Sequence, residues 1–469
     1  MEAARKVQET YHRTGRAERG RRPARGRKAP GYVARLEAVS GSRQAWETGT
    51  HSHAVNLRRQ SAARPRTSPR LRHTARSSRH RISGAGDEWK VGHRVSRGDT
   101  IWSSTTPLRH MAQLDGLRAF AVALVLCYHF YRPARQYVHL GGIGVRVFFV
   151  LSGFLITGIL LRSRALRDAG QVPAGLALRH FYIRRILRIF PLYYFALTIA
   201  WLGKVSGVRE GIAWHVAYLS NVHFFLVNAV HHNQWGGGVS HLWSLAVEEQ
   251  FYLLWPWVIL FAPRRWRPGI AMGAAAVGPV FRFVVYGVTG NDITPVLLPG
   301  CIDSLALGAY LAMTVLPEYK SHPLVRPVGG PVLWCGVLLF GAYLAAEQTD
   351  GYWMFRMVSF DLAIALMGVW LVARAAEGMT GPVGKFLALA PVRYIGTISY
   401  GIYVYHLLLP ELVPRVARRL GHPDLLAPLG DKTLGFLAFY GALTILVAAI
   451  SWHCFEAPIN RLKARFEYR

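Results

Sequence analysis

Long apolar runs occupy most of the chain from residue 114 onward. Their lengths, about 17 to 25 residues, match what an α-helix needs to cross about 30 Å of hydrocarbon. The pattern predicts an all-α, polytopic integral membrane protein with about ten transmembrane helices and no appended soluble domain. The predicted spans are residues 114–132, 140–161, 186–204, 242–262, 269–288, 295–315, 329–346, 356–375, 390–410 and 433–453.

A further apolar stretch at residues 211–230 is weaker, because two histidines and two asparagines interrupt it. Basic loops of membrane proteins face the cytoplasm. If this stretch crossed the membrane, the basic sequence RRWR at 264–267 and the basic C-terminal tail would lie outside. We therefore expect it to lie along the outer surface or to re-enter, which leaves ten spans and both termini cytoplasmic. The basic loop at 414–424 then falls outside, against the rule.

The composition supports a membrane protein, but residues 1–110 differ from the rest. The whole chain is 52% hydrophobic, whereas this segment carries 25 Lys and Arg against 8 Asp and Glu and has few apolar runs. Such a segment cannot bury enough surface to fold alone. Three interpretations stay open: a basic arm for nucleic acid or anionic lipid, a transit segment, against which the acidic residues argue, or translated upstream sequence before a true start at Met111. We place no function there, expect no nucleic-acid partner, and expect the membrane domain at 111–469.

The four cysteines lie inside apolar stretches. They are Cys127, Cys301, Cys335 and Cys454, with no close pair and no histidine at metal-ligand spacing. Small buried side chains explain them. We therefore predict no metal site, no disulfide framework and no bound cofactor.

Ionisable residues inside the apolar runs are the candidates for chemistry, because they are expensive at membrane depth. Arg118 and His129 are eleven residues apart, about three helical turns, so they share one face and are predicted to line one cavity. The alternative is that each side chain extends to its own membrane interface. Arg185 and Arg188 share a face of the third predicted span. They are either a cytoplasmic flank or a clamp for a phosphate-bearing donor.

More polar residues accompany these four. Ser244 and Glu248, at positions i and i+4, lie on one helix face, and Glu249 adds a second carboxylate. Asp303 and His406 lie inside later apolar runs.

These motifs resemble the membrane-bound acyltransferase 3 family, which includes bacterial O-acyltransferases of surface polysaccharides, peptidoglycan and macrolides. The likeness covers about residues 112–465. The motifs that carry it, in order, are LDGLRAFAVALVLCYHF, GVRVFFVLSGFLIT, FYIRRILRIFPLYY, LWSLAVEEQFYLLWP, ISYGIYVYH and SWHCFEAPINRLKAR. The family usually has an acidic residue where this chain has Arg146. That departure predicts either an altered acceptor choice or a pairing of Arg146 with a buried carboxylate.

The resemblance implies a cell-membrane enzyme that moves an acyl group, often acetyl, from acyl-CoA to a hydroxyl of a glycan, glycolipid or macrolide. The family's arginine–ten residues–histidine motif falls on Arg118 and His129. His129 would act as general base, or as a transient acyl carrier, and Arg118 would position the donor or stabilise developing charge.

The other family motifs imply further roles. Arg185 and Arg188 would hold the CoA phosphates. Glu248, with Ser244, would orient the acceptor or tune His129. The residues expected to support the acceptor site are Ser244, Trp243, Glu249, Asp303 and His406.

Two rival hypotheses stay open. The first is a proton-coupled transporter or flippase of a lipid-linked glycan, with a relay of buried charges; it would be supported by pseudo-symmetric halves, and none is visible. The second is a nucleic-acid or lipid-binding protein that acts through residues 1–110.

Overall fold

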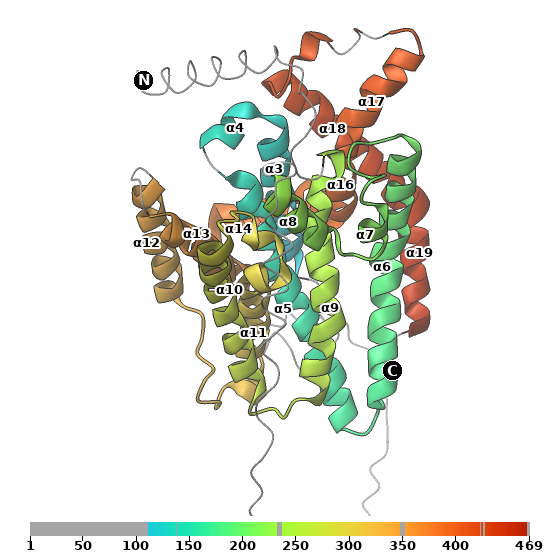
Figure 1. Ribbon diagram of the computed structural model, residues 1–469. Helices are drawn as coiled ribbons and strands as arrows, with labels where there is room; N and C mark the ends of the chain where they lie inside the picture. Colours follow the sequence, from blue (N-terminus) through green and yellow to red (C-terminus); the bar gives the residue numbers. More distant parts are fainter. Residues whose placement is uncertain are drawn as a thin grey trace, which may run out of the picture. The chain divides into compact units, whose positions relative to one another are not determined.

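A computed structural model describes residues 111–137, 139–231, 237–347, 352–422, 424 and 427–466. The basic segment 1–110 and the predictions made for it lie outside these residues. Within the described ranges every regular element is helical (Figure 1). The α-helices are α3 (Ala112–Phe130), α4 (Arg132–Tyr137), α5 (Leu140–Asp168), α6 (Ala174–Leu202), α7 (Ile212–Val216), α8 (Ser220–His231), α9 (Trp243–Phe261), α10 (Arg267–Thr289), α11 (Leu298–Thr314), α12 (Gly330–Glu347), α13 (Trp353–Glu377), α14 (Gly381–Ala388), α15 (Ala390–Thr397), α16 (Ser399–Tyr405), α17 (Leu408–Arg419), α18 (Leu434–Ser451) and α19 (Ala457–Arg461).

Six of these helical segments are long and apolar enough to cross a membrane. They are Leu140–Asp168, Ala174–Leu202, Arg267–Thr289, Gly330–Glu347, Trp353–Glu377 and Leu434–Phe466. The part of the chain that the structure describes is therefore all-helical, with several helices suited to a multi-pass membrane protein. The count of ten spans is not established by these six and stays a prediction.

The structure breaks the predicted span 390–410 into consecutive short helices, α15 and α16, followed by α17. The side chain of Thr397 donates a hydrogen bond of 3.0 Å to the Arg393 carbonyl. Such bonds from Thr to the preceding turn bend helices. The bend falls where α15 approaches α3, because a Cβ added to Gly396 would lie 1.9 Å from the Asp115 carbonyl oxygen.

The apolar stretch 211–230 forms two short helices, α7 and α8, rather than one long one. Tyr218, between them, has a left-handed φ of 54°. A helix of 12 residues, the length of α8, is about 18 Å long, which is too short to cross about 30 Å of hydrocarbon.

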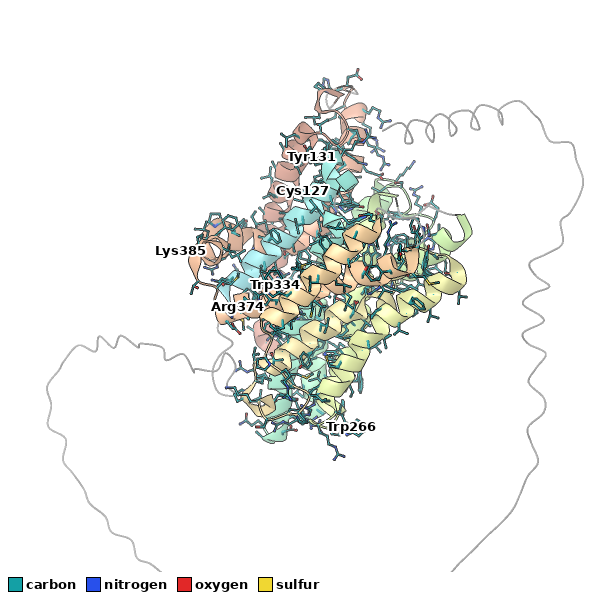
Figure 2. All side chains as sticks on the ribbon, turned by 90° about the vertical axis from the view of Figure 1, so that its left-hand side faces the viewer. Cys127, Tyr131, Trp266, Trp334, Arg374 and Lys385 are labelled. Carbon is teal, nitrogen blue, oxygen red and sulfur yellow. The ribbon has the colours of Figure 1, made fainter. Side chains whose placement is uncertain are left out.

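Helix α5 forms the centre of the described bundle. Of its most apolar window 72% is buried, against 17% for α12, whose Trp334 side chain projects from the surface (Figure 2). Glycines bring α5 and α11 together: a Cβ on Gly153 would lie 1.9 Å from the Leu305 carbonyl oxygen, and one on Gly308 would lie 2.2 Å from that of Val150. Small residues allow this backbone approach between membrane helices.

Helices α3 and α9 pack directly on α5, and α16 packs on both α3 and α6. The inward faces of these helices carry most of the polar residues singled out in the sequence. The bundle therefore brings together side chains that lie far apart along the chain.

Candidate functional site

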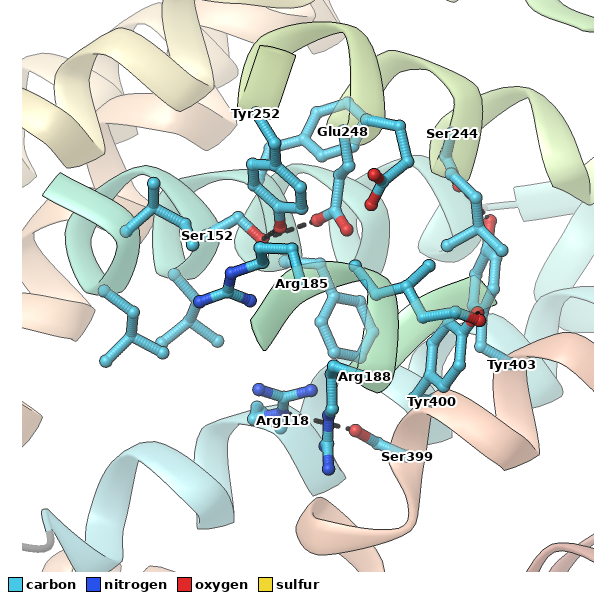
Figure 3. Close-up of a pocket in the computed structure, with 18 of the residues that line it drawn as sticks. Arg118, Ser152, Arg185, Arg188, Ser244, Glu248, Tyr252, Ser399, Tyr400 and Tyr403 are labelled. Carbon is cyan, nitrogen blue, oxygen red and sulfur yellow. Dashed lines mark hydrogen bonds between the residues drawn. The ribbon is translucent and has the colours of Figure 1, made fainter. Parts of the chain in front are cut away.

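A first cavity, of about 210 Å³, lies between α3, α5, α6, α9 and α16. Three of its lining residues are arginines: Arg118 from α3, and Arg185 and Arg188 from α6 (Figure 3). We call it the arginine cavity. The helical spacing of Arg185 and Arg188 places both on one face of α6, and both line this cavity.

The three guanidinium groups are held by polar and aromatic contacts. Arg118 Nε donates to Ser399 Oγ at 3.3 Å, Arg185 lies 5.3 Å from the ring centroid of Tyr252, and Arg188 lies 5.2 Å from that of Trp452. Among the described residues, none of the three forms an ion pair within 4.0 Å. Guanidinium groups without such pairs suit phosphate oxygens, because their planar N–H donors match phosphate geometry.

Helix α9 supplies the opposite wall of the arginine cavity. Ser244 and Glu248 line it, as their spacing of four residues predicts, and Glu249 lines it as well. Glu248 Oε1 accepts a hydrogen bond of 2.6 Å from Ser152 Oγ (Figure 3), whereas Glu249 Oε1 is buried without a hydrogen-bond partner among the described residues. Ser244 Oγ lies 2.6 Å from the Tyr403 hydroxyl.

A second cavity, of about 300 Å³, is lined by His129 and Trp243. We call it the histidine cavity. It adjoins the first, since Val145 and Tyr403 line both. The prediction that Arg118 and His129 share one cavity is therefore wrong: three helical turns separate them along α3, far enough for each to open into a different space.

The hydrogen bonds of His129 assign its tautomer. His129 Nδ1 lies 3.0 Å from the Val125 carbonyl oxygen, and His406 Nδ1 lies 2.6 Å from that of Tyr403. Carbonyl oxygens only accept, so the neutral form of each ring carries its hydrogen on Nδ1. His406 Nε2 can then accept from His129 Nδ1, 3.3 Å away. The unprotonated nitrogen of His129 is Nε2, which is the atom that a general base needs.

His241 extends this pair into a cluster of three histidines, and the sequence interpretation missed it. Its ring centroid lies 4.6 Å from that of His406, and its Nε2 donates to the Val404 carbonyl at 3.1 Å. The sequence could have identified His241 as a candidate, because it lies two residues before Trp243 in the motif HLWSLAVEEQ. Among the described residues no group of three or more His, Cys, Asp or Glu side chains is arranged to hold a metal ion.

Asp303 lines neither cavity, unlike the expectation that it supports the acceptor site. Its Oδ2 lies 2.8 Å from Arg282 Nη2, and both side chains are fully buried. Arg282 also lies 3.7 Å from Asp361, which accepts a hydrogen bond of 2.6 Å from Arg146 Nε. Arg146 thus pairs with a buried carboxylate, one of the two outcomes predicted for it. Arg282 and Asp361 were missed, although each is a charge inside an apolar run.

The family model described as "Acyltransferase domain" matches residues 111–455. The chain belongs to the acyltransferase 3 family. Its relatives include peptidoglycan O-acetyltransferase OatA of Listeria monocytogenes, 29% identical over 75% of this chain and 56% of OatA. They also include the YrhL protein of Bacillus subtilis, 29% identical over 77% and 56%, and O-acetyltransferase OatA of Staphylococcus aureus, 27% identical over 75% and 58%. The chain spans little more than half the length of these relatives. No solved structure matches it.

The family's arginine–histidine motif therefore links two adjoining cavities in this member. Arg118 lies at the cavity that gathers three arginines, and His129 at the cavity that also contains Trp243. The first arrangement can bind a polyanion, and the second can accept a proton from a hydroxyl group.

Proposed function

We propose that this protein is an integral membrane O-acyltransferase that moves an acyl group, in the simplest case acetyl, from acyl-CoA to a hydroxyl of a glycan, glycolipid or macrolide. The observation that carries the proposal is the cavity lined by Arg118, Arg185 and Arg188, which adjoins the cavity of His129. The reaction requires a site that binds the polyanionic donor and a side chain that accepts the proton of the attacking hydroxyl.

The arginine cavity would bind the donor. Arg185 and Arg188 would hold CoA phosphates, since hydrogen bonds from guanidinium groups to phosphates are about twice as strong as neutral ones. Arg118, the third arginine of this cavity, would help to position the donor. Glu248, held by Ser152, lines the arginine cavity and not the cavity of His129, so it would orient these arginines instead of the acceptor or His129.

His129 would act as the general base. Its Nε2 takes the proton of the acceptor hydroxyl as the oxygen attacks the thioester carbonyl, so a C–O bond forms and the C–S bond breaks. The departing CoA thiolate then takes the proton from the imidazolium. Transient acylation of His129 is the alternative route, and it would place the same acyl group on Nε2 before transfer.

A glycan acceptor is favoured by the three relatives, because all of them carry the name O-acetyltransferase and two of them the name peptidoglycan O-acetyltransferase. Trp243, Tyr403 and other aromatic side chains line the histidine cavity, and such rings pack well against the apolar faces of sugars.

In a cytoplasmic membrane with ten spans and both termini inside, the start of α3 faces the cytoplasm. Arg118 then lies on the acyl-CoA side and His129 on the outer side.

The test uses membranes that contain the protein, radiolabelled acetyl-CoA, and the His129→Ala variant. The matched control is His322→Ala, because His322 lies outside both cavities. We expect label in extracted glycans or glycosides from wild-type and His322→Ala membranes, and none from His129→Ala. If neither label nor free CoA appears with several acyl lengths and acceptors, the proposal is wrong.

Neither the family nor the named relatives support the transporter or flippase hypothesis. A transporter would move a glycan without releasing CoA, so the same assay separates the two functions.

A further inference from the structure

We propose that the histidine cavity binds an anionic group, a carboxylate or a phosphate, on the acceptor, and that Arg146 and Arg356 form this subsite. The inference rests on the proposed function for the identity of the ligand as an acceptor. Both arginines line the cavity, together with His129. An acceptor whose anionic group is bound there would present one of its own hydroxyl groups to His129.

Arg146 is buried, and only part of its donor capacity is used. Its Nε donates to Asp361, and its Nη2 lies 3.5 Å from the Pro295 carbonyl oxygen, the limit of a hydrogen bond. Its Nη1 is buried with no hydrogen-bond partner among the described residues. A buried guanidinium N–H without an acceptor is costly, and an anionic ligand would supply one.

Arg356 carries the charge that the surrounding groups leave uncompensated. Arg146 and Arg282 face the carboxylates of Asp361 and Asp303, so that network holds two cations and two anions. Within the described part of the chain, Arg356 has no carboxylate within 4.0 Å, and its Nε is buried without a hydrogen-bond partner. Its guanidinium carbon lies 4.3 Å from the Trp353 ring centroid, in a cation–π contact.

The other titratable groups at the cavity do not cancel this charge. His139 and His241 line it and are neutral or positive. Glu347 lies beside the rim, where its carboxylate is 4.0 Å from His139 Nε2 and accepts a hydrogen bond from Tyr343. Asp361 is the lining carboxylate, and it already faces two arginines.

The test compares three methyl glycosides of N-acetylglucosamine: the neutral sugar, the sugar with a 3-O-lactyl carboxylate, and the sugar with a 3-phosphate. Acetyl transfer and equilibrium binding are both measured, with wild-type protein and Arg356→Gln, Arg356→Lys and Arg146→Gln variants in lipid nanodiscs. Arg374→Gln is the matched control, because Arg374 lies on the same helix α13 but pairs with Glu377 at the surface (Figure 2).

We expect wild-type protein and Arg374→Gln to favour one charged sugar over the neutral one by about tenfold or more, in kcat/KM or in Kd, as expected for a charge-assisted hydrogen bond. Arg356→Gln and Arg146→Gln should bring this ratio close to one, and Arg356→Lys should restore part of it. The better of the two charged sugars identifies the anion. Equal ratios in wild-type protein and Arg356→Gln overturn the inference. If no sugar is acetylated, that result counts against the proposed function. The binding measurements still test the anion subsite in that case.

Discussion

Replacing Asp303 with Asn tests whether this residue stabilises the fold rather than binding the acceptor. The carboxylate of Asp303 lies 2.8 Å from Arg282 Nη2, and neither side chain is exposed. Removing one partner of a buried ion pair leaves the other charge uncompensated and costs about 3–5 kcal/mol of folding free energy.

The structure places the expected loss near the lower end of that range. Arg282 keeps hydrogen bonds to three backbone carbonyls, of Gly300 at 2.6 Å, Met357 at 3.0 Å and Val358 at 3.2 Å. It also keeps Asp361 at 3.7 Å. We therefore expect Asp303→Asn to lower the free energy of unfolding by about 3 kcal/mol, a change of more than a hundredfold in the ratio of folded to unfolded protein.

The assay is reversible unfolding in mixed micelles as the fraction of SDS rises, followed by tryptophan fluorescence. Asp168→Asn is the control, because Asp168 pairs with Arg164 at an exposed position and should change stability by less than about 1 kcal/mol. Adding Arg282→Met to Asp303→Asn should recover part of the loss, since removing both charges is far less costly than removing one. An Asp303→Asn protein that unfolds like the wild type, yet has a raised KM for the acceptor, would refute this reasoning.

Two further predictions concern His406 and Gly308. His406→Phe should lower kcat about fivefold without changing the KM for acetyl-CoA, because it removes one of the two acceptors near His129 Nδ1, a hydrogen bond of about 1 kcal/mol. Steady-state kinetics measure this against the exposed control His453→Phe, and equal behaviour of the two variants would contradict it. Gly308→Ala should destabilise the protein by about 1–3 kcal/mol, because its Cβ would lie 2.2 Å from the Val150 carbonyl oxygen. Thermal unfolding measures the loss, and a Gly273→Ala protein, with open space at that position, should show none.

Local patterns predict the helices well, and they fail where a local bond or a polar extension intervenes. The apolar run 140–161 predicts α5, but the helix continues to Asp168, because RSRALRD is polar yet helix-forming and Arg164 pairs with Asp168 one turn later. The run 390–410 looks like one span. Its bend at Thr397 depends on a side-chain bond that hydropathy does not register.

The site shows the same limit. Helical spacing predicts that Arg185 and Arg188 share a face, and that Ser244 and Glu248 do, and both pairs line one cavity. Spacing also predicts that Arg118 and His129 share a side, but it does not reveal the wall of Val145 and Tyr403 between two cavities. That wall is built by α5 and α16.

Local sequence patterns do not predict contacts between residues that lie far apart along the chain. The partners of Arg282 are Asp303, on the next helix, and Asp361, almost eighty residues later. Single charges in apolar runs identify these residues as unusual, but only the packing of α10, α11 and α13 decides that they pair with one another. The cluster of His129, His241 and His406 likewise brings together residues from three separate motifs.

The most direct test of the central claim is the single-turnover rate of acetyl transfer as a function of acetyl-CoA concentration, for wild-type, Arg188→Gln and His129→Ala proteins. If the arginine cavity binds the donor and His129 performs the proton transfer, Arg188→Gln should reach the wild-type plateau at about ten- to a hundredfold higher acetyl-CoA. His129→Ala should keep the wild-type midpoint while its plateau falls by about a hundredfold or more. A wild-type plateau in His129→Ala, or an unchanged midpoint in Arg188→Gln, would contradict the account.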